Sequence, residues 1–532
     1  ENVQHWQLAR EAVKHKFPLR VLRLACMFYR MNRRISIGNI ITSAVATAQT
    51  IVAGCSFATT LLRLALLSCL DTINARYPSI ELYVVVDDIT VSCLDKDENK
   101  ATLLVSSATA RLTTALEEDC KLKIQRAKSQ ILTNNPAGVA SIQKYDPSLA
   151  EAQTYHARNL GVDFCAGKRL VWKVRKKRFS NIYRRVNRLR TLRRTGAKTA
   201  NVARMAITPA LTYAVGVTGI NDSQLNTVRR NLRKGACAHT AGRSLTIDLA
   251  CLGSRYDPAY LANRSPIEMW ASALWEKWVP RHRFVAVWHH AVKGFNAKRP
   301  WLGVCGPGGG VLATTHRVGW EPVKMETCDA AIPHKLITHQ GVVDMLQLCP
   351  KSVGDLVDEA TEQWLWISES AKNPNLKYLD RGCFFDPLRE LLSCKNTKDW
   401  GGPEKGQLKS CLANGIWPQE RLYKAGLVES DKCLICGEVG SLFHRIWKCP
   451  QLNDHRFQYG NPFMHRVNEP KTSYSYKIMK RPLLPISWAV PSPLSDPECE
   501  EHICWDMPAT AGFLTGDVCG DGSGLYGKRK RF

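Results

Sequence analysis

Two adjacent aspartates interrupt an otherwise apolar stretch, and this pattern limits the local fold most strongly. Residues 80–86 are rich in β-branched and aromatic side chains, Asp87 and Asp88 follow, and residues 89–93 are again largely apolar. Two such runs joined by two polar residues predict a β-hairpin with its turn at Asp87–Asp88. Adjacent carboxylates repel each other unless a cation or a proton intervenes. The hairpin therefore predicts a divalent-metal site, and the alternative is an ordinary Asx turn with solvated acids.

The segments around this hairpin predict an α+β domain that ends near residue 165. Residues 5–31 have the spacing of two helices broken at Pro18, and residues 56–75 and 100–120 have that of one helix each. Short strands are expected near residue 131 and over 159–164. Helices and antiparallel strands in this order are typical of the α+β class. With 532 residues, the chain is long enough for three or more domains.

Positive charge is concentrated in the segment that follows. The chain has 74 Lys and Arg against 47 acidic residues, a net charge of +27. Residues 165–221 contain no acidic side chain, and 15 Lys or Arg lie between Lys168 and Arg204. Apolar residues recur there at helical spacing, which predicts basic helices with one packed face. A nucleic acid is the expected partner, and the alternative is a soluble basic enzyme.

A compact group of metal-ligating residues lies near the C-terminus. Cys433, Cys436, His444 and Cys449 fall within 17 residues. Three thiolates and one imidazole at this spacing suit tetrahedral Zn²⁺. The aromatic residues Phe443 and Trp447, which lie between the ligands, are expected to stack on exposed bases.

Cysteine usage and hydropathy limit the compartment. Twenty cysteines in 532 residues are too dilute for a disulfide scaffold, so an intracellular protein is expected, nuclear or cytoplasmic and not secreted. Residues 35–62 are uncharged, but polar side chains interrupt them repeatedly, so no membrane association is expected. The chain opens with Glu1 rather than Met, which predicts a piece of a longer product. Nothing in the sequence indicates a specific protein partner.

The first 165 residues resemble the palm of reverse transcriptases, especially those of non-LTR retrotransposons. Val85-Val86-Asp87-Asp88 is similar to the family's aromatic-x-Asp-Asp motif. The segment around Gly54 is similar to its Gln-Gly-x-Pro segment, where a glycine admits template and nucleotide. Lys128 matches a lysine that neutralises the leaving pyrophosphate, and Leu160-Gly161 resembles the turn that grips the primer end.

This resemblance implies an RNA-directed DNA polymerase that uses an RNA template, a DNA primer and dNTPs. Two Mg²⁺ ions would serve nucleotidyl transfer, held by Asp87 and Asp88 with one further aspartate. The basic segment would be the thumb, which follows the nucleic acid backbone. The thumb residues that the resemblance assigns to nucleic acid are Arg175, Lys176, Lys177, Arg184 and Arg185.

The sequence also departs from the family pattern. The first metal-binding aspartate and the fingers would lie before Glu1, and Val85 replaces the usual aromatic residue. The expectation is therefore a retrotransposon polyprotein fragment that is inactive as this chain. The alternative is a non-catalytic nucleic-acid-binding remnant of a decayed polymerase.

The C-terminal half completes the expected organisation. A similar Cys-Cys-His-Cys element follows the polymerase in many non-LTR retrotransposons, and Gly520-Asp521-Gly522-Ser523 resembles the start of ribonuclease H, whose first aspartate binds Mg²⁺. The expected fold is a truncated α+β palm, a helical thumb, a helical connector and a small zinc element. The expected boundaries are palm 1–165, thumb 166–300, connector 301–405, zinc element 406–455, linker 456–508 and truncated ribonuclease H 509–532.

Overall fold

The computed structural model describes residues 3–488, apart from Ala48, Ala53, 135–139, 141–143, 145–152, 167–170, 238–240, 326–327 and 459–463. The chain divides into two compact units, the first made of Glu1–Leu365 and Asn396–Ile416, the second of Trp366–Lys395 and Trp417–Phe532. Asp521, the expected ribonuclease H segment 509–532 and part of the expected linker lie outside the described residues.

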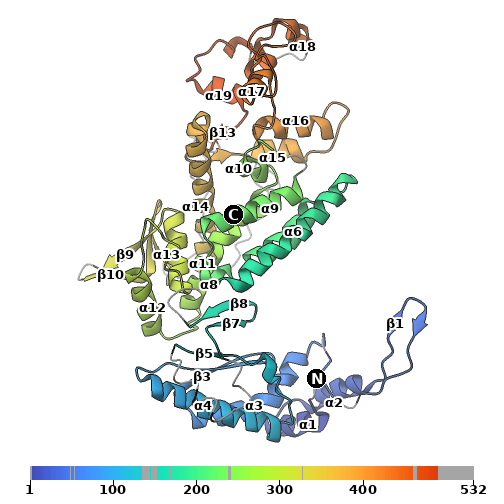
Figure 1. The fold of residues 1–532 in the computed structure, drawn as a ribbon, viewed down its shortest axis with the longest axis vertical. Helices are drawn as coiled ribbons and strands as arrows, with labels where there is room; N and C mark the ends of the chain where they lie inside the picture. Colours follow the sequence, from blue (N-terminus) through green and yellow to red (C-terminus); the bar gives the residue numbers. More distant parts are fainter. Residues whose placement is uncertain are drawn as a thin grey trace, which may run out of the picture. The chain divides into compact units, whose positions relative to one another are not determined.

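The N-terminal part of the first unit consists of helices and short strand pairs (Figure 1). Pro18 precedes the second helix, so the expected break in residues 5–31 is confirmed. A π-helical turn, Ala115–Asp119, extends the fourth helix. The elements are α1 (His5–Lys14), α2 (Leu19–Arg30), β1 (Ser36–Ile37), β2 (Ile40–Ile41), α3 (Ala58–Arg76), β3 (Ile80–Val85), β4 (Asp88–Cys93) and α4 (Glu98–Thr114).

The β3–β4 hairpin packs one face on α3 and α4. Strand side chains alternate between faces, so Ile80, Leu82, Ile89 and Val91 all point the same way and pack in one cluster with Leu112. The opposite face carries polar residues and no helix of that cluster. The hairpin thus packs on helices from one side, while on its polar face Asn159 contacts Thr90 and Arg283 contacts Glu81.

The remaining strands of this region form separate pairs. β1 pairs with β2 and β7 with β8 in antiparallel fashion, while β5 pairs with β6 in parallel. The expected α+β class is confirmed, but within the described residues these strands do not join β3–β4 in one sheet. The bounds are β5 (Ile131–Leu132), β6 (Gln153–Thr154), β7 (His156–Asn159) and β8 (Val162–Cys165).

Helices dominate the next segment, as the apolar spacing predicts. Ile182, Val186 and Leu189 line one side of the long helix α6 and pack on Ile207 and Leu232 of two neighbouring helices. Most of the basic side chains of α6 take its other sides and are exposed, whereas Arg175 is buried. The helices are α6 (Lys173–Arg194), α7 (Ala200–Thr212), α8 (Val215–Thr218), α9 (Asp222–Ala236), α10 (Leu245–Ala250) and α11 (Pro258–Trp275).

The expected helical connector contains a β-sheet as well. β9, β10 and β11 form a three-stranded antiparallel sheet in the order β11-β10-β9, so the expectation of helices alone is wrong. Leu336 of this sheet packs on Trp270 and Trp288 in a second core. The elements are α12 (Arg281–Lys293), α13 (Pro307–Arg317), β9 (Glu321–Met325), β10 (Cys328–Thr338), β11 (Gly341–Asp344), α14 (Pro350–Lys372) and α16 (Gly402–Leu412).

Short elements make up the second unit. β12 pairs with β13, and the hydroxyl of Tyr378 donates to the backbone oxygen of Leu483 over 3.2 Å, so the two chain segments of this unit are joined. In the part of the chain that the structure describes, no helix is long and apolar enough to cross a bilayer. The elements are β12 (Cys383–Phe384), α15 (Asp386–Ser393), α17 (Gln419–Lys424), the turn His444–Lys448, α18 (Asn453–Gln458), α19 (Tyr474–Lys480) and β13 (Leu484–Pro485).

Candidate functional site

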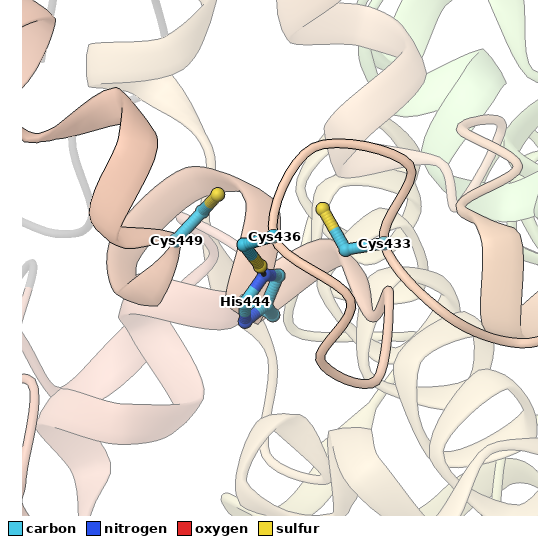
Figure 2. A group of neighbouring side chains, drawn as sticks. All are labelled: Cys433, Cys436, His444 and Cys449. Atoms are coloured by element: carbon cyan, nitrogen blue, oxygen red, sulfur yellow. Dashed lines mark hydrogen bonds between the residues drawn. The ribbon is translucent and has the colours of Figure 1, made fainter.

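The four metal-ligating residues of the second unit converge on one point. Figure 2 shows Cys433 on a loop, with Cys436, His444 and Cys449 turned toward the same centre. One ligand atom from each residue lies within 4.8 Å of all the others, and Sγ of Cys436 is 3.1 Å from Nε2 of His444. The sequence-predicted ligand set is thus brought together. Its geometry fits a tetrahedral ion such as Zn²⁺.

Backbone amides prepare the first of these thiols for metal binding. The N–H groups of Ile435 and Cys436 face the sulfur of Cys433 and lower the pKa of its thiol to about 6. Gly437 has φ +80° and donates its N–H to the carbonyl of Cys433 over 2.9 Å, which closes the turn. A thiolate is the form that binds metal. This tight turn therefore favours the ligating state of Cys433.

Gly440 sits where the cluster loop meets α17. A Cβ atom there would lie 2.8 Å from Cβ of Gln419 and 3.1 Å from both the oxygen of Asp431 and the nitrogen of Cys433. The hydroxyl of Ser441 then accepts from the N–H of His444 over 3.0 Å and starts the helical turn that carries the imidazole. The loop leaves no room for a side chain at this position.

The two aromatic residues between the ligands have structural roles. Phe443 is buried and its ring centroid lies 4.4 Å from that of Tyr476 in α19. The indole N–H of Trp447 donates to the carbonyl of Met479 over 2.8 Å. The expectation that Phe443 and Trp447 stack on bases is therefore wrong for Phe443, because its ring is already covered by α19. Trp447 is partly exposed and is held by the same helix.

The turn of the aspartate hairpin lies one residue earlier in the chain than expected. Val85 pairs with Asp88, so the two-residue turn is Val86–Asp87, and Asp88 begins β4. Val86 has φ +59°. Only the first turn residue has positive φ, which is the sign pattern of a type II′ turn. A β-branched residue is strained in this region. The turn thus stores strain next to the two carboxylates.

The polar face of the hairpin carries Asp88 together with Thr90 and Ser92, opposite Val85, Tyr83 and Glu81. Asp87 and Asp88 are both exposed to solvent. Among the described residues they join no group of three metal-ligating side chains, in contrast to the cysteine cluster. Mg²⁺ is often held by one or two carboxylates plus substrate phosphates. An ion held at this pair would therefore need further oxygen ligands from elsewhere.

The β7–β8 turn connects this polar face to the basic helix. The amide of Asn159 donates to the hydroxyl of Thr90 over 3.3 Å. The next residues, Leu160 and Gly161, have φ +47° and +76° and form a tight turn. The hydroxyl of Tyr213 donates to the Leu160 carbonyl over 2.6 Å, while a guanidinium from α6, that of Arg178, donates to the Gly161 carbonyl. The expected primer-gripping turn therefore lies beside the aspartate hairpin.

Side chains that sequence reasoning missed hold this turn and the start of α6. The carboxylate of Asp163 accepts the N–H groups of Val174 and Arg175 over 2.8 and 3.1 Å, and His156 contacts it at 2.6 Å. The guanidinium of Arg178 also covers the ring of Tyr213, 4.4 Å from its centroid. No motif in the sequence distinguishes these residues from others of their type.

Arg175 is not available for nucleic acid, contrary to expectation. Its side chain is 4% exposed, and its guanidinium donates to the carbonyl of Gly219 and the hydroxyl of Thr218 over 2.9 and 2.7 Å. Burial lowers the pKa of its guanidinium to about 10. Positions 175, 179, 182, 186 and 189 form one helical stripe, and this spacing could have identified the buried arginine. The other predicted contacts, Lys176, Lys177, Arg184 and Arg185, are exposed.

Two more predicted residues lie on exposed turns. Gly54 has φ +87°, with open space where a side chain would be, in a turn closed by the N–H of Cys55 and the carbonyl of Val52. Lys128 is exposed in a single 3₁₀ turn. Two residues later, the side chain of Gln130 accepts the N–H of Arg158 in β7 over 3.1 Å. The segment that follows Lys128 therefore contacts the β7–β8 hairpin, which also contacts the aspartate hairpin through Asn159.

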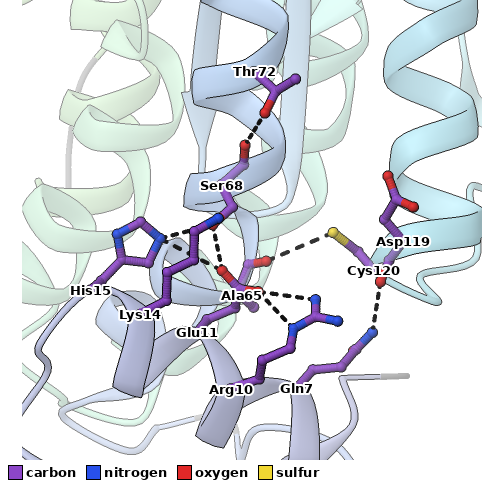
Figure 3. Close-up of polar contacts among 10 residues, drawn as sticks. All are labelled: Gln7, Arg10, Glu11, Lys14, His15, Ala65, Ser68, Thr72, Asp119 and Cys120. Atoms are coloured by element: carbon purple, nitrogen blue, oxygen red, sulfur yellow. Dashed lines mark hydrogen bonds and ion pairs between the residues drawn. The ribbon is translucent and has the colours of Figure 1, made fainter.

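A polar network joins α1 to α3 (Figure 3). The Ser68 hydroxyl donates to the carboxylate of Glu11 over 2.5 Å and accepts from Lys14 and His15 over 2.9 and 2.8 Å. The same imidazole nitrogen of His15 also lies 3.6 Å from Glu11. A Ser-His-Glu triad needs the two imidazole nitrogens to take different partners. This network is therefore a structural contact rather than a nucleophilic site.

Comparison with known proteins adds no identification. No family model matches the chain, and no curated protein matches it. Two geometric features of the described residues bear on function. One is a convergent Cys3His cluster, and the other is a hairpin with two exposed carboxylates tied to a basic helix through the Leu160–Gly161 turn.

Proposed function

We propose that the chain is the palm and thumb part of a retrotransposon reverse transcriptase that binds an RNA template and a DNA primer. One observation carries this proposal. The Leu160–Gly161 turn contacts the polar face of the aspartate hairpin through Asn159 and contacts the basic helix α6 through Arg178. A primer end held at this turn would lie between the carboxylates and a phosphate-binding surface. The same juxtaposition supports the sequence resemblance.

The basic helix supplies sequence-independent affinity in this proposal. Lys176, Lys177 and Arg184 are exposed on α6, where each can neutralise a phosphate. Gly54 admits template and nucleotide, since nothing lies within 4 Å of the side-chain position. In the intact parent enzyme, Lys128, on its exposed turn, would neutralise the pyrophosphate that leaves the incoming dNTP.

Asp87 and Asp88 are the proposed magnesium ligands. When bound, two Mg²⁺ ions would activate the primer hydroxyl and stabilise the departing pyrophosphate. The chain's own residues hold the carboxylates at a rigid turn, because β3 and β4 are paired over six positions and packed on α3 and α4. The described residues place no third carboxylate beside the pair. We therefore propose that this chain binds primer–template without extending it.

A non-catalytic nucleic-acid-binding protein is the second candidate. The observation that favours it is the same exposed, two-carboxylate arrangement, which offers fewer fixed ligands than a two-metal site uses. The Cys3His cluster suits either candidate, because a structural zinc ion stabilises a small unit whatever that unit binds. The two candidates share the α6 surface and differ only in the role of the aspartates.

Binding is tested with a labelled RNA–DNA primer–template and the full chain. We expect the affinity to fall as salt rises, and the Lys176→Gln/Lys177→Gln variant to reduce the slope of log K against log salt by about 1.4–1.8. The matched control is Lys395→Gln/Lys398→Gln, which removes two exposed charges from the segment between α15 and α16 and should leave the slope unchanged. A slope that does not change in the α6 variant would remove the proposed surface.

Primer extension with Mg²⁺ and dNTPs tests catalysis. The full chain is expected to give no product. Product formation that disappears in Asp87→Asn would establish the active enzyme and refute the proposed inactivity. Product formation that persists in Asp87→Asn would refute the assignment of the aspartates.

A further inference from the structure

Helix α12 presents an unusual outward face in a segment that none of the sites above uses. Phe284 and Trp288 bury the inner side of this helix in the core. At 100° per residue, the exposed positions form a single arc opposite them. The side chains of that arc are basic or histidine apart from the small Ala286 and, at its edge, Val287, which is 46% exposed. The arc consists of His282, Arg283, Ala286, Val287, His289, His290 and Lys293.

The surroundings of α12 strengthen its positive character. No acidic residue occurs between Lys277 and Trp320, and Arg281, Lys298 and Arg299 are exposed beside the helix ends. Arg283 pairs with Glu81 of β3, so its charge is partly engaged. The remaining groups of the arc carry no ion pair among those observed in the described chain. A face of this kind attracts a polyanion, and the small Ala286 lets a backbone approach closely.

An exposed aromatic side chain lies just before α12 in the chain. Trp278 is 55% exposed, and its indole N–H donates to the carboxylate of Glu276 over 2.7 Å. That bond holds the edge of the ring and leaves its face open. Trp278 precedes Arg281 by three residues, so chain length alone keeps the two Cα atoms within about 12 Å. A base stacked on Trp278 would place its neighbouring phosphates over α12.

We propose that α12 and Trp278 form a binding surface for single-stranded nucleic acid, separate from α6. Arg281, Lys293 and the histidines contact phosphates, and Trp278 stacks on a base. The combination of a positive helix face and an exposed aromatic ring is what single strands require, because their bases are free to stack. A duplex offers the phosphates but conceals the base faces. The proposal does not depend on whether the aspartates bind magnesium.

The test measures binding of the full chain to a labelled single-stranded oligonucleotide and to a duplex of the same length. The Arg281→Gln/Lys293→Gln variant should reduce the single-strand salt slope by about 1.4. Trp278→Ala should lower single-strand affinity at least about fivefold and leave duplex affinity unchanged. The control Lys395→Gln/Lys398→Gln should change neither quantity.

Each other outcome overturns the inference. An α12 variant that behaves like the control would show that the face does not contact nucleic acid. An equal loss of duplex and single-strand affinity in Trp278→Ala would exclude base stacking. These outcomes can be distinguished from failure of the proposed function. The proposed function is tested separately, by the effect of Lys176→Gln/Lys177→Gln on primer–template binding.

Discussion

The side-chain amide of Asn159 donates a hydrogen bond to the hydroxyl of Thr90 over 3.3 Å. This bond joins two hairpins through residues that are 69 positions apart in the chain, and Thr90 stands two positions from Asp88 on the same strand face. The Leu160–Gly161 turn is thereby placed beside the carboxylates. The same turn is held from α6 by Arg178. A single short turn thus links the candidate catalytic face to the candidate phosphate-binding helix.

Backbone strain at Val86 leads to the first prediction. Val86→Gly should raise the local free energy of unfolding of the hairpin by about 1 kcal/mol, because strain of about 1–3 kcal/mol at positive φ exceeds the entropic cost of glycine. Val85→Gly is the control, since Val85 lies on a paired strand, and it should lower that free energy by about 1 kcal/mol. Hydrogen exchange of residues 80–93 measures both effects. Equal destabilisation by the two variants would disprove strain at the turn.

Metal content tests the Cys3His cluster. The full chain should bind one zinc ion that survives dialysis, and Cys436→Ser should lose it, because three ligands remain where a structural site needs four. The control is Cys305→Ser, which replaces an exposed cysteine of the first unit. Elemental analysis gives the readout. Retention of zinc by Cys436→Ser, or its loss from Cys305→Ser, would count against the assigned ligands.

Crowding at Gly440 gives a prediction that does not touch a ligand. Gly440→Ala should destabilise the cluster loop by about 1–3 kcal/mol, because the added carbon meets Gln419 and the backbone at 2.8–3.1 Å. Gly406→Ala in α16 has nothing within 4 Å and should be neutral or slightly stabilising. The rate of zinc release to a chelator measures the difference. Similar release rates in the two variants would show that the loop tolerates a side chain at position 440.

The contact between α1 and α3 is expected to depend on pH. Burial raises the pKa of Glu11, but the hydrogen bonds from Ser68 and Arg10 outweigh burial and hold this pKa below the ordinary value of a glutamate. A carboxyl group whose pKa is lowered by folding stabilises the fold above its unfolded pKa, and this stabilisation disappears as the pH falls through the folded pKa. Protection of α1 from hydrogen exchange should therefore weaken as the pH is lowered from about 5 toward 3.

Ser68→Ala isolates this contact. It should weaken the α1–α3 contact by about 1–3 kcal/mol at neutral pH, because the buried Glu11 loses the donor that α3 supplies, and it should reduce the pH dependence below about pH 5. Ser180→Ala, on the exposed side of α6, is the matched control and should have neither effect. An unchanged pH profile in Ser68→Ala would show that the Ser68–Glu11 bond is not its origin.

The sequence was sufficient for the helices of the first 120 residues, the aspartate hairpin and the four cysteine–histidine ligands. It could not place the hairpin turn, because two registers keep the same residues inside. Val84 opposite Ile89, as observed, and Val84 opposite Val91 both keep the apolar alternation intact. The difference lies in whether Val86 accepts a strained conformation, and apolar patterning carries no information on that.

The sequence also did not indicate which individual arginines are buried. A run of basic residues indicates a solvated face, yet Arg175 lies inside because Thr218 and Gly219 supply acceptors from a distant segment. The partners of Asp163 and Tyr213 are likewise set by tertiary contacts. Such contacts follow from the packing of whole helices and leave no local pattern in the chain.

Iron-directed cleavage is the most direct measurement of the central claim that the two aspartates bind a divalent ion beside the primer end. Fe²⁺ replaces Mg²⁺, and ascorbate with peroxide generates radicals at the bound ion. We expect the chain to be cut near residues 85–89 and a 5′-labelled primer to be cut near its 3′ end, with both cuts lost in Asp87→Asn/Asp88→Asn. Cuts that persist in this variant, or a primer left intact by a chain that binds it, would contradict the claim.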